Sequence, residues 1–165
     1  MTHTNTQLQK IQTLLLWADK HNLSVDIFPR DVETLFSLEK LNLSSQNLSA
    51  IIPEISILQN LKELYISSNS LRSLPKEIGE MKNLEVLWLQ DNKLQILPAG
   101  ILLLSSLKDL VLFSNRLRTL PIEISTLPSL KFLNLNYNYL DSNTIDRISG
   151  NINSECMFAA HDQQE

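Results

Sequence analysis

Few residues in this chain have the types and spacing that catalysis or metal binding requires. The three histidines, His3, His21 and His161, are scattered between the two ends of the chain, and no group of Cys and His has metal-ligand spacing. Cys156 is the only cysteine, and no histidine lies at a predictable distance from it, so we expect an ordinary structural thiol. The three glycines form no phosphate-binding loop. We therefore predict no catalytic residue, no metal site, no cofactor and no enzyme activity.

One pair of carboxylates, Glu63 and Asp109, could act together as general acid and base if they lay close to each other. Glu63 and Asp109 occupy equivalent positions of the repeat described below. If each repeat contributes one strand, two strand spacings of ~4.8 Å separate them by about 10 Å, and no histidine shares their face. We expect these carboxylates to form solvated ion pairs with neighbouring residues.

The dominant feature of the sequence is a repeat with a period of 23 residues. Each copy follows the pattern Leu-x-x-Leu-x-Leu/Ile-x-x-Asn-x-Leu, in which only Gln46 replaces the asparagine. A second block follows each of three copies in phase: LPKEIGEM, LPAGILLL and LPIEISTL, with IIPEISIL in the first repeat. The copies open at Leu38, Leu61, Leu84, Leu107 and Leu130.

Within each copy, apolar and polar residues alternate with the period of a short, half-buried strand. The asparagine then predicts a turn. We expect the following proline to bar a helix or strand from the opposite side and to impose an extended or tight-turn path there. A single coil of this kind buries too few side chains to offset the entropy of ordering its backbone, so the coils must stack.

These motifs resemble the leucine-rich repeat superfamily, and specifically its 23-residue LPxxI class, which occurs in intracellular and small bacterial proteins. The resemblance covers residues 28–140. It implies a right-handed α/β solenoid with a parallel sheet on its concave face. Stacking would also align the repeated asparagines into an internal ladder that satisfies backbone groups of the turns. The predicted ladder residues are Asn69, Asn92, Asn115 and Asn138.

Both ends of a solenoid need a cover. Residues 1–27 are predicted to be an N-terminal helical cap, in which Thr6-x-x-Gln9 resembles a capping box and Leu8, Ile11, Leu14, Leu15 and Ala18 form the apolar face of a helix over residues 6–21. Residues 28–37 match half a repeat and lead into the first full one. A short helix over 141–150, closed by Gly150, is predicted as the C-terminal cap, and the aperiodic residues 151–165 as a mobile tail.

The strand alternation exposes three columns of side chains on the concave face. Their first-repeat members are polar, whereas six residues on the later strands should form one apolar and aromatic patch, and large exposed patches of this kind usually bind partners. Tyr137 and Tyr139 border the patch, and Asp91, Lys93, Arg116 and Arg118 form a charged rim. The six patch residues are Tyr65, Val86, Trp88, Val111, Phe113 and Phe132. The alternative is that these aromatics only stabilise neighbouring strands.

Composition limits the remaining classes of function. A net charge of −4 without a basic run argues against nucleic acid, and no apolar run approaches the roughly 18–20 residues of a membrane span. A single cysteine excludes an intrachain disulfide and favours the cytoplasm or another reducing compartment.

We therefore expect a monomeric, non-enzymatic protein-binding module. Three alternatives remain: a bacterial effector delivered into a host cell, a self-assembling structural unit, and an enzyme similar to repeat-bearing bacterial ubiquitin ligases. The last would require a large cysteine-bearing catalytic domain, which we do not expect after the last repeat. Leu102 and Leu103, two leucines beyond those that the core needs, are the candidate residues for self-association on the convex side.

Overall fold

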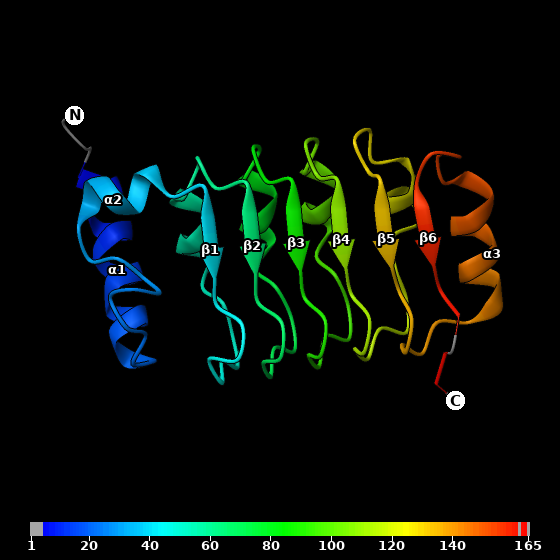
Figure 1. Ribbon diagram of the computed structural model, residues 1–165, viewed down its shortest axis with the longest axis horizontal. Coiled ribbons are helices and arrows are strands. Elements are labelled where there is room, and N and C mark those ends of the chain that lie inside the picture. The colour runs from blue at the N-terminus through cyan, green and yellow to red at the C-terminus, as the bar shows by residue number, and fades with distance from the viewer. Residues whose placement is uncertain (1–4, 162, 165) are drawn as a thin grey trace.

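The computed structural model describes residues 5–161, 163 and 164 of the chain. In this part of the chain six short parallel strands form one sheet in sequence order, and successive strands pair with each other (Figure 1). The predicted α/β solenoid with a parallel sheet is confirmed. The strands are β1 Lys40–Asn42, β2 Glu63–Tyr65, β3 Val86–Trp88, β4 Asp109–Val111, β5 Phe132–Asn134 and β6 Met157–Ala159.

The register of the sheet follows the repeat without a slip as far as β5. Leu41, Leu64, Leu87, Leu110 and Leu133 are aligned across the five strands, and each is at most 1% exposed. Their neighbours in the same strands face the opposite side of the sheet, because successive side chains of a strand alternate. A slip of one residue would move every leucine to solvent, so the apolar column itself holds the register.

The opposite, convex side carries a row of short 3₁₀ helices, one for each of the first four repeats. The expectation that proline bars a helix there is wrong, and of the extended or tight-turn path that was expected, the chain adopts tight helical turns. Proline fixes φ near −65° and lacks an N–H, and both properties suit the beginning of a helical turn, where the N–H has no partner to lose. Pro75, Pro98 and Pro121 precede the first helical residue, and Pro53 is itself the first. These helices are η1 Pro53–Ile57, η2 Lys76–Glu80, η3 Ala99–Leu103 and η4 Ile122–Thr126.

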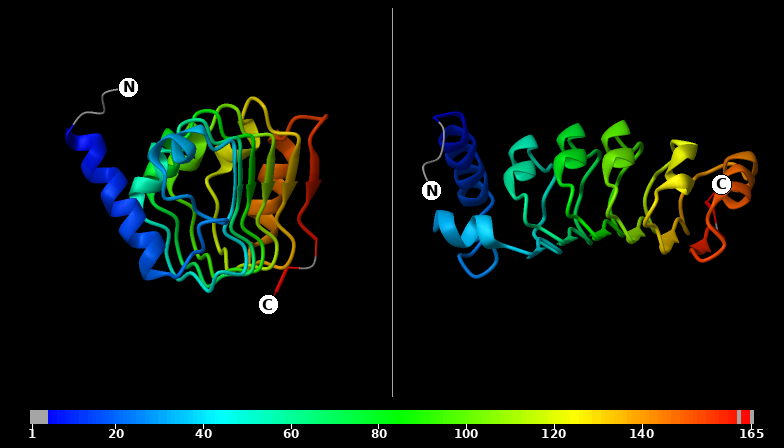
Figure 2. Two further views of the ribbon diagram at one scale, coloured as in Figure 1. Left: turned by 60° about the vertical axis from the view of Figure 1, so that its left-hand side comes forward. Right: turned by 90° about the horizontal axis from the view of Figure 1, so that it is seen from above.

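Glycines allow η2 and η3 to approach each other closely. A Cβ atom on Gly79 would collide with the backbone of Gly100, and one on Gly100 would collide with the carbonyl of Lys76. The equivalent of Gly79 in repeats one and four is a small buried serine, Ser56 or Ser125. The third repeat has Leu102 there, and η3 and η4 approach each other less closely than their predecessors do (Figure 2). We infer that the larger side chain spaces these two helices apart.

Helix α1 (Asn5–Lys20) lies across the N-terminal end and packs against η1, at the end of the convex row (Figures 1 and 2). Its buried residues are Ile11, Leu14, Trp17 and Ala18. Trp17, which was not predicted, contacts the ring of Phe28 edge to face, with 6.1 Å between the ring centroids. Two expectations are wrong: Leu8 is 43% exposed, and the helix begins at Asn5, which places Thr6 inside it instead of at a capping position.

Residues 28–37 contribute two fully buried side chains, Phe28 and Leu35. Their helix α2 (Val32–Ser37) begins after Asp31, whose carboxylate accepts a hydrogen bond of 2.8 Å from the backbone N–H of Thr34. Figure 2 shows α2 beyond β1, at the end of the row of strands, while α1 occupies the end of the convex row. The half repeat therefore covers the strand side only.

The C-terminal region differs from prediction. Helix α3 (Ser142–Asn151) begins after Asp141 and packs against η4, and it continues to Asn151, so Gly150 lies within it and does not close it. The predicted tail contains a strand within its described part: β6 pairs in parallel with β5, aligning Leu133 with Phe158. The helix thus forms the convex side of the fifth repeat, and β6 begins a sixth coil (Figure 2). Among the described residues, no helix is long and apolar enough to span a membrane.

Candidate binding surface on the concave sheet

The asparagine ladder fixes the turns from which the concave side chains project. The Asn92 carbonyl accepts a hydrogen bond of 3.0 Å from the backbone N–H of Leu71 in the preceding coil. Its amide donates to the carbonyls of Ile66, also in the preceding coil, and Leu89 in its own, at 2.9 and 3.1 Å. Asn69, Asn115 and Asn138 make the corresponding bonds. Each amide therefore joins two coils, which makes the turns rigid.

Glutamines stand at both ends of this ladder. Gln46 in the first repeat donates to the carbonyl of Ser44, at 3.0 Å. In the sixth coil, Gln163 accepts from the backbone N–H of Leu140 and donates to the carbonyl of Leu135, both at 3.2 Å. Gln163 thus performs for the last coil the function that asparagine performs elsewhere, and it was not recognised in the sequence.

The most specific arrangement on the concave face joins the first three strands. The rings of Tyr65 and Trp88, which are paired across β2 and β3, meet edge to face with 4.9 Å between their centroids. The Tyr65 hydroxyl donates to the Glu63 carboxylate at 2.8 Å, and the Lys40 ammonium lies 4.8 Å from the centroid of the Tyr65 ring. Lys40 also pairs with Glu63 at 3.0 Å. This cluster of four side chains holds the two aromatic rings in position.

The charges of this cluster reinforce each other. Hydrogen bonds from Lys40 and then from Tyr65 lower the pKa of the Glu63 carboxyl, and its bond to Glu63 raises the pKa of the Lys40 ammonium. Burial, followed by the bond to Glu63, raises the pKa of the Tyr65 hydroxyl. Glu63 is therefore an ionised anchor for its neighbours and is not poised to exchange a proton near neutral pH.

An open depression of about 430 Å³ lies over this cluster. Only Tyr65 and Trp88 of its lining residues were predicted site residues. Sequence reasoning missed the others because they are polar, in the first repeat or at Ser67 and Gln90, and an apolar-patch criterion discards polar positions. The lining residues are Lys40, Asn42, Ser44, Tyr65, Ser67, Trp88 and Gln90.

The remaining predicted residues do not all join this surface. Val111 is 6% exposed and unavailable to a partner, which corrects its assignment as an exposed patch residue. Its short side chain is paired with the large Trp88 on β3. Asp109 stands between Val86 and Phe132 in their row, so the predicted patch is interrupted there. Val86, Phe113 and Phe132 are half-buried.

Tyr137 lies beyond the strands, in the turn that follows β5, and its side chain is 47% exposed. Its φ of 55° is in the left-handed region. Ser45, Ser68, Asp91 and Ser114 share this conformation at the equivalent turn positions. Small or polar residues adopt it at lower cost than a tyrosine does, so an aromatic side chain is retained at this turn despite local strain.

Two carbonyl oxygens lack partners in the third concave column, which consists of Ser44, Ser67, Gln90, Phe113 and Asn136. Gln90 Oε1 and Asn136 Oδ1 are buried without a hydrogen bond among the described residues. The Asn136 side chain as a whole is half-buried. Phe113 lies between these residues in the same column, and its aromatic ring has no strong hydrogen-bond donor to offer to their carbonyl oxygens.

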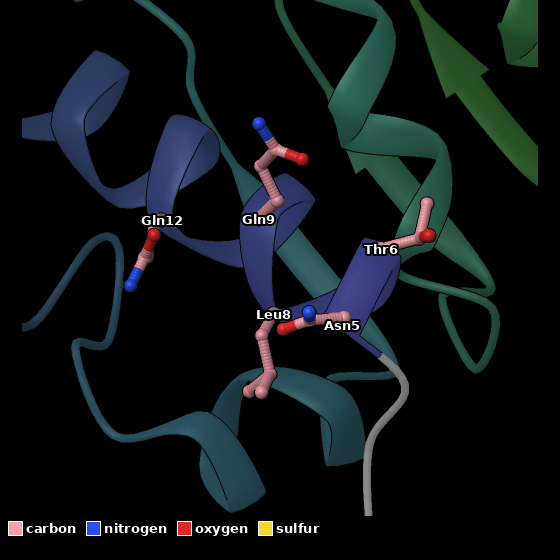
Figure 3. A pocket seen from close by; sticks show the side chains of 5 residues that line it. All are labelled: Asn5, Thr6, Leu8, Gln9 and Gln12. Atoms are coloured by element: carbon pink, nitrogen blue, oxygen red, sulfur yellow. The ribbon is translucent and has the colours of Figure 1, made fainter.

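Arg116, predicted as part of the rim, faces a second depression of about 300 Å³ together with Gln95, Arg118 and Tyr139. Asp91 is exposed and in the left-handed conformation, and it lines neither this depression nor the one over Trp88. A third hollow, along the first turns of α1, is lined by Asn5, Thr6, Leu8, Gln9 and Gln12 (Figure 3). None of these five residues is titratable, and none could act as a base to activate the Thr6 hydroxyl, so this hollow suggests no chemistry.

No arrangement among the described residues suggests catalysis. No group of three or more His, Cys, Asp or Glu side chains is placed there to hold a metal ion. The His21 ring, just after the N-terminal helix, contacts the Trp17 carbonyl at 2.8 Å, and His3 lies outside the described residues. Burial, and then the charge of Asp109, raises the pKa of the Cys156 thiol, which keeps it protonated and weakly nucleophilic.

The comparisons with known proteins agree with this architecture. A family model described as Leucine rich repeat matches residues 36–94 and 82–140. A leucine-rich repeat protein of Leptospira interrogans is 40% identical, with a TM-score of 0.71 over 84% of this chain and 35% of that one. The chain therefore spans about a third of the length of that structure. No curated protein sequence gives a significant match.

Two further solved structures are similar. The leucine-rich repeat ectodomain of the plant membrane receptor kinase GASSHO1/SCHENGEN3 from Arabidopsis thaliana was solved in complex with CASPARIAN STRIP INTEGRITY FACTOR 2. It is 34% identical, with a TM-score of 0.63 over 78% of this chain and 16% of that one. An internalin from Listeria monocytogenes has a TM-score of 0.62 over 82% of this chain and 40% of that one. At 20% identity it shows the fold alone.

Proposed function

Because the chain belongs to the leucine-rich repeat family, we propose that it is a protein-binding module that holds a segment of a partner protein on its concave sheet. The observation that carries the proposal is the cluster around Tyr65 and Trp88, in which two aromatic rings are fixed at the wall of an open depression. Aromatic side chains held in place before binding lose little conformational entropy on association and are frequent hot spots.

Three features support this proposal. Trp88 is 38% exposed although its neighbours in sequence, Leu87 and Leu89, are fully buried, so the core does not require it. The backbone around the depression is joined coil to coil, which leaves little to reorganise on binding. The similar plant ectodomain was solved in complex with another molecule, so this architecture can present a binding surface.

The binding surface that we propose is centred on Tyr65 and Trp88, with Lys40 and Gln90 as polar contacts at its border. Phe113, Phe132 and Tyr137 extend it toward the C-terminal coils. Lys40 and Gln90 offer hydrogen bonds that a partner backbone or side chain can accept or donate. The partner is therefore expected to place an apolar side chain against Trp88 and polar groups around it.

The decisive experiment compares Trp88→Ala with Leu89→Ala. Trp88→Ala should lower the free energy of unfolding by less than about 1 kcal/mol, against about 2–5 kcal/mol for Leu89→Ala, because only Leu89 is fully buried. It should nevertheless weaken partner binding by about 2 kcal/mol or more. Chemical denaturation gives the first quantity. Affinity capture from a lysate, followed by titration of the captured protein, gives the second.

Two outcomes would contradict the proposal. If Trp88→Ala destabilises the protein as much as Leu89→Ala does, Trp88 belongs to the core. If capture and stability are both unchanged, the binding surface lies elsewhere. The exposed side of η3, where Leu103 is 58% exposed while Leu102 packs partly against the core, would then be tested for self-association by sedimentation at several concentrations.

We further propose a reducing compartment, since Cys156 has no second cysteine in this chain with which to pair. The cytoplasm of the producing cell and that of a host cell that receives the protein as an effector are both reducing. Fractionation of infected and uninfected cells with an antibody to the protein would separate these possibilities, and recovery from an oxidising compartment would contradict both.

A further inference from the structure

The turns that follow the strands, at the edge of the sheet where the arrows of Figure 1 end, carry four cations without acidic partners. We call Arg72, Lys93, Arg116 and Arg118 the basic edge. The ion pairs within 4.0 Å among the described residues lie elsewhere and include none of these four. At the opposite edge, where the strands begin, charges neutralise each other across adjacent coils: Lys62 pairs with Glu39 at 2.9 Å, and Lys108 pairs with Glu85 at 2.6 Å.

Two acidic residues on the same series of turns, Asp91 and Asp141, do not neutralise the basic edge. The Asp141 carboxylate accepts a 2.7 Å hydrogen bond from the backbone N–H of Thr144 at the start of α3. Asp91 is exposed and makes no ion pair among the described residues with Lys93, two positions further on. The basic edge is thus a region of unpaired positive charge on a chain whose net charge is −4.

Two of these cations converge on a formed depression. Arg116 and Arg118 line the hollow of about 300 Å³ with Gln95 and Tyr139. The Arg118 guanidinium lies 5.3 Å from the centroid of the Tyr139 ring, which restricts its position. The backbones beneath are joined to the preceding coils, Arg116 to Leu94 at 2.8 Å and Tyr139 to Leu117 at 2.9 Å. The depression therefore offers two guanidinium groups and a side-chain amide on a rigid base.

We propose that this depression binds the side-chain carboxylates of an acidic segment of the partner protein. The inference rests on the proposed function, because the acidic segment would lie next to the segment held on the concave sheet. Guanidinium groups match the two oxygens of a carboxylate and form strong, charge-assisted hydrogen bonds with them. Unpaired cations beside a binding surface also attract an acidic partner before contact and raise the rate of association.

The charge distribution favours an acidic protein segment over other anions. A nucleic acid neutralises many phosphates at once and binds proteins with extended basic surfaces. Here the basic edge has four cations, and the neighbouring concave face carries the carboxylates Glu63 and Asp109. An acidic peptide can place its few carboxylates on the arginines and its uncharged residues on the aromatic rings.

The test uses two labelled peptides of equal length. One carries a run of glutamates followed by alternating aromatic and aliphatic residues, and the other has glutamine in place of every glutamate. Fluorescence anisotropy should show the glutamate peptide binding at least about tenfold more tightly. Its affinity should fall as salt rises from about 50 to 300 mM, because screening weakens exposed charge pairs.

The matched variants are R116E/R118E and K76E/K131E. Both lower the formal net charge equally, but Lys76 and Lys131 are exposed cations outside the basic edge. R116E/R118E should weaken binding of the glutamate peptide by about tenfold or more, while K76E/K131E should change it less than about twofold. Amide chemical shifts in the NMR spectrum should move at the turns around Gln95, Arg116 and Tyr139. Thermal unfolding of each variant verifies that both remain folded.

Several results would overturn the inference: equal binding of the two peptides, no detectable binding of the glutamate peptide at low salt, or equal effects of the two double variants. Tighter binding of single-stranded DNA or of phosphatidylserine vesicles, lost in R116E/R118E, would assign the basic edge to those ligands instead. Failure of the proposed function is distinguishable. If Trp88→Ala weakens both peptides and R116E/R118E weakens neither, the concave site stands and the acidic-segment inference fails.

Discussion

At the scale of single residues, two asparagines only two positions apart contribute differently to the structure. Asn136 and Asn138 belong to one turn, yet Asn138 is fully buried and joins two coils, whereas the carbonyl oxygen of Asn136 is buried without a partner. Replacing a paired amide strands its partners, while replacing an unpaired carbonyl strands nothing. The energetic importance of an asparagine here depends on its hydrogen bonds and not on its burial.

This difference leads to a prediction for the ladder. Asn92→Ala should lower the free energy of unfolding by about 1–3 kcal/mol, because the buried Leu71 N–H loses its partner and the Ile66 carbonyl keeps only its bond from Asn69. Asn136→Ala, the matched control, should change it by less than about 0.5 kcal/mol. Urea denaturation of the two variants measures both quantities. Equal losses would show that the ladder bonds contribute nothing specific.

Tyr137 supports a second prediction at this scale. Asparagine adopts the left-handed conformation more readily than tyrosine, so Tyr137→Asn should raise the free energy of unfolding by about 0.5–1 kcal/mol. Ser114→Asn, at the same turn position of the preceding repeat, is the control and should have a smaller effect. A clear loss of stability in Tyr137→Asn would mean that the half-exposed ring contributes more packing than its conformation costs.

At the scale of elements, the convex helices pack at a distance that the side chains between them set. Gly79 and Gly100 permit the closest approach, between η2 and η3, and Leu102 occupies the corresponding small-residue position before η4. The repeats therefore share one backbone pattern without sharing one spacing. Spacing on the convex side influences the curvature of the sheet on the other, and so the shape of the concave surface.

Alanine at the helix contact should show this dependence. Gly100→Ala should lower the free energy of unfolding by about 1–3 kcal/mol, because the new Cβ meets the backbone of η2, which cannot move aside as a flexible side chain would. Gly150→Ala is the control. That Cβ has no neighbour within 4 Å and lies in α3, where alanine is the better helix former, so stability should rise by up to about 1 kcal/mol. Thermal melts of both variants measure these changes in stability, and a stabilised Gly100→Ala protein would contradict the close packing of η2 and η3.

At the scale of the whole molecule, each coil is stabilised mainly by contacts with the coils beside it. The two end coils are therefore the places where the stack most needs additional cover. Each inner coil is covered on both sides, whereas the first and last have one neighbour each. Helix α1 covers η1 at one end, and α3 with β6 forms the last coil at the other. The ends of this molecule are therefore built from the least regular parts of its sequence.

Deletion of residues 1–24 tests the covering role of α1. The deletion removes the buried side chains of Leu14, Trp17 and Ala18 and exposes the apolar surface that they contact. Each large buried side chain is worth about 1.5–3 kcal/mol, so the melting temperature should fall and aggregation should follow. Sedimentation velocity and thermal melts measure these effects. The control is Leu16→Ser, at a position 69% exposed on the same helix, which should melt as the wild type does. A truncated protein that stays monomeric with an unchanged melting temperature would contradict the covering role.

The sequence by itself determined the repeated part of this protein: the fold, the strand register from β1 to β5 and the positions of the ladder. It could do so because each repeat places the same residue types at the same points of a turn, so that each coil repeats the local geometry of its neighbour. The same reasoning identified Tyr65 and Trp88 as concave residues, since strand alternation assigns them to that face. Where the period holds, local pattern and tertiary structure agree.

Only the tertiary structure determines the parts of the molecule that do not follow the 23-residue period. Strand β6 lies 25 residues beyond β5, and neither Phe158 nor Ala160 continues the leucine pattern, so no repeat was visible there. The strand forms because β5 and the Asn138 turn present unpaired backbone groups, which β6 and Gln163 satisfy. The burial of Val111, the orphan oxygen of Asn136 and the unpaired basic edge likewise depend on neighbouring coils. A periodic pattern specifies where a side chain points, but only its neighbours across the stack determine what that side chain meets.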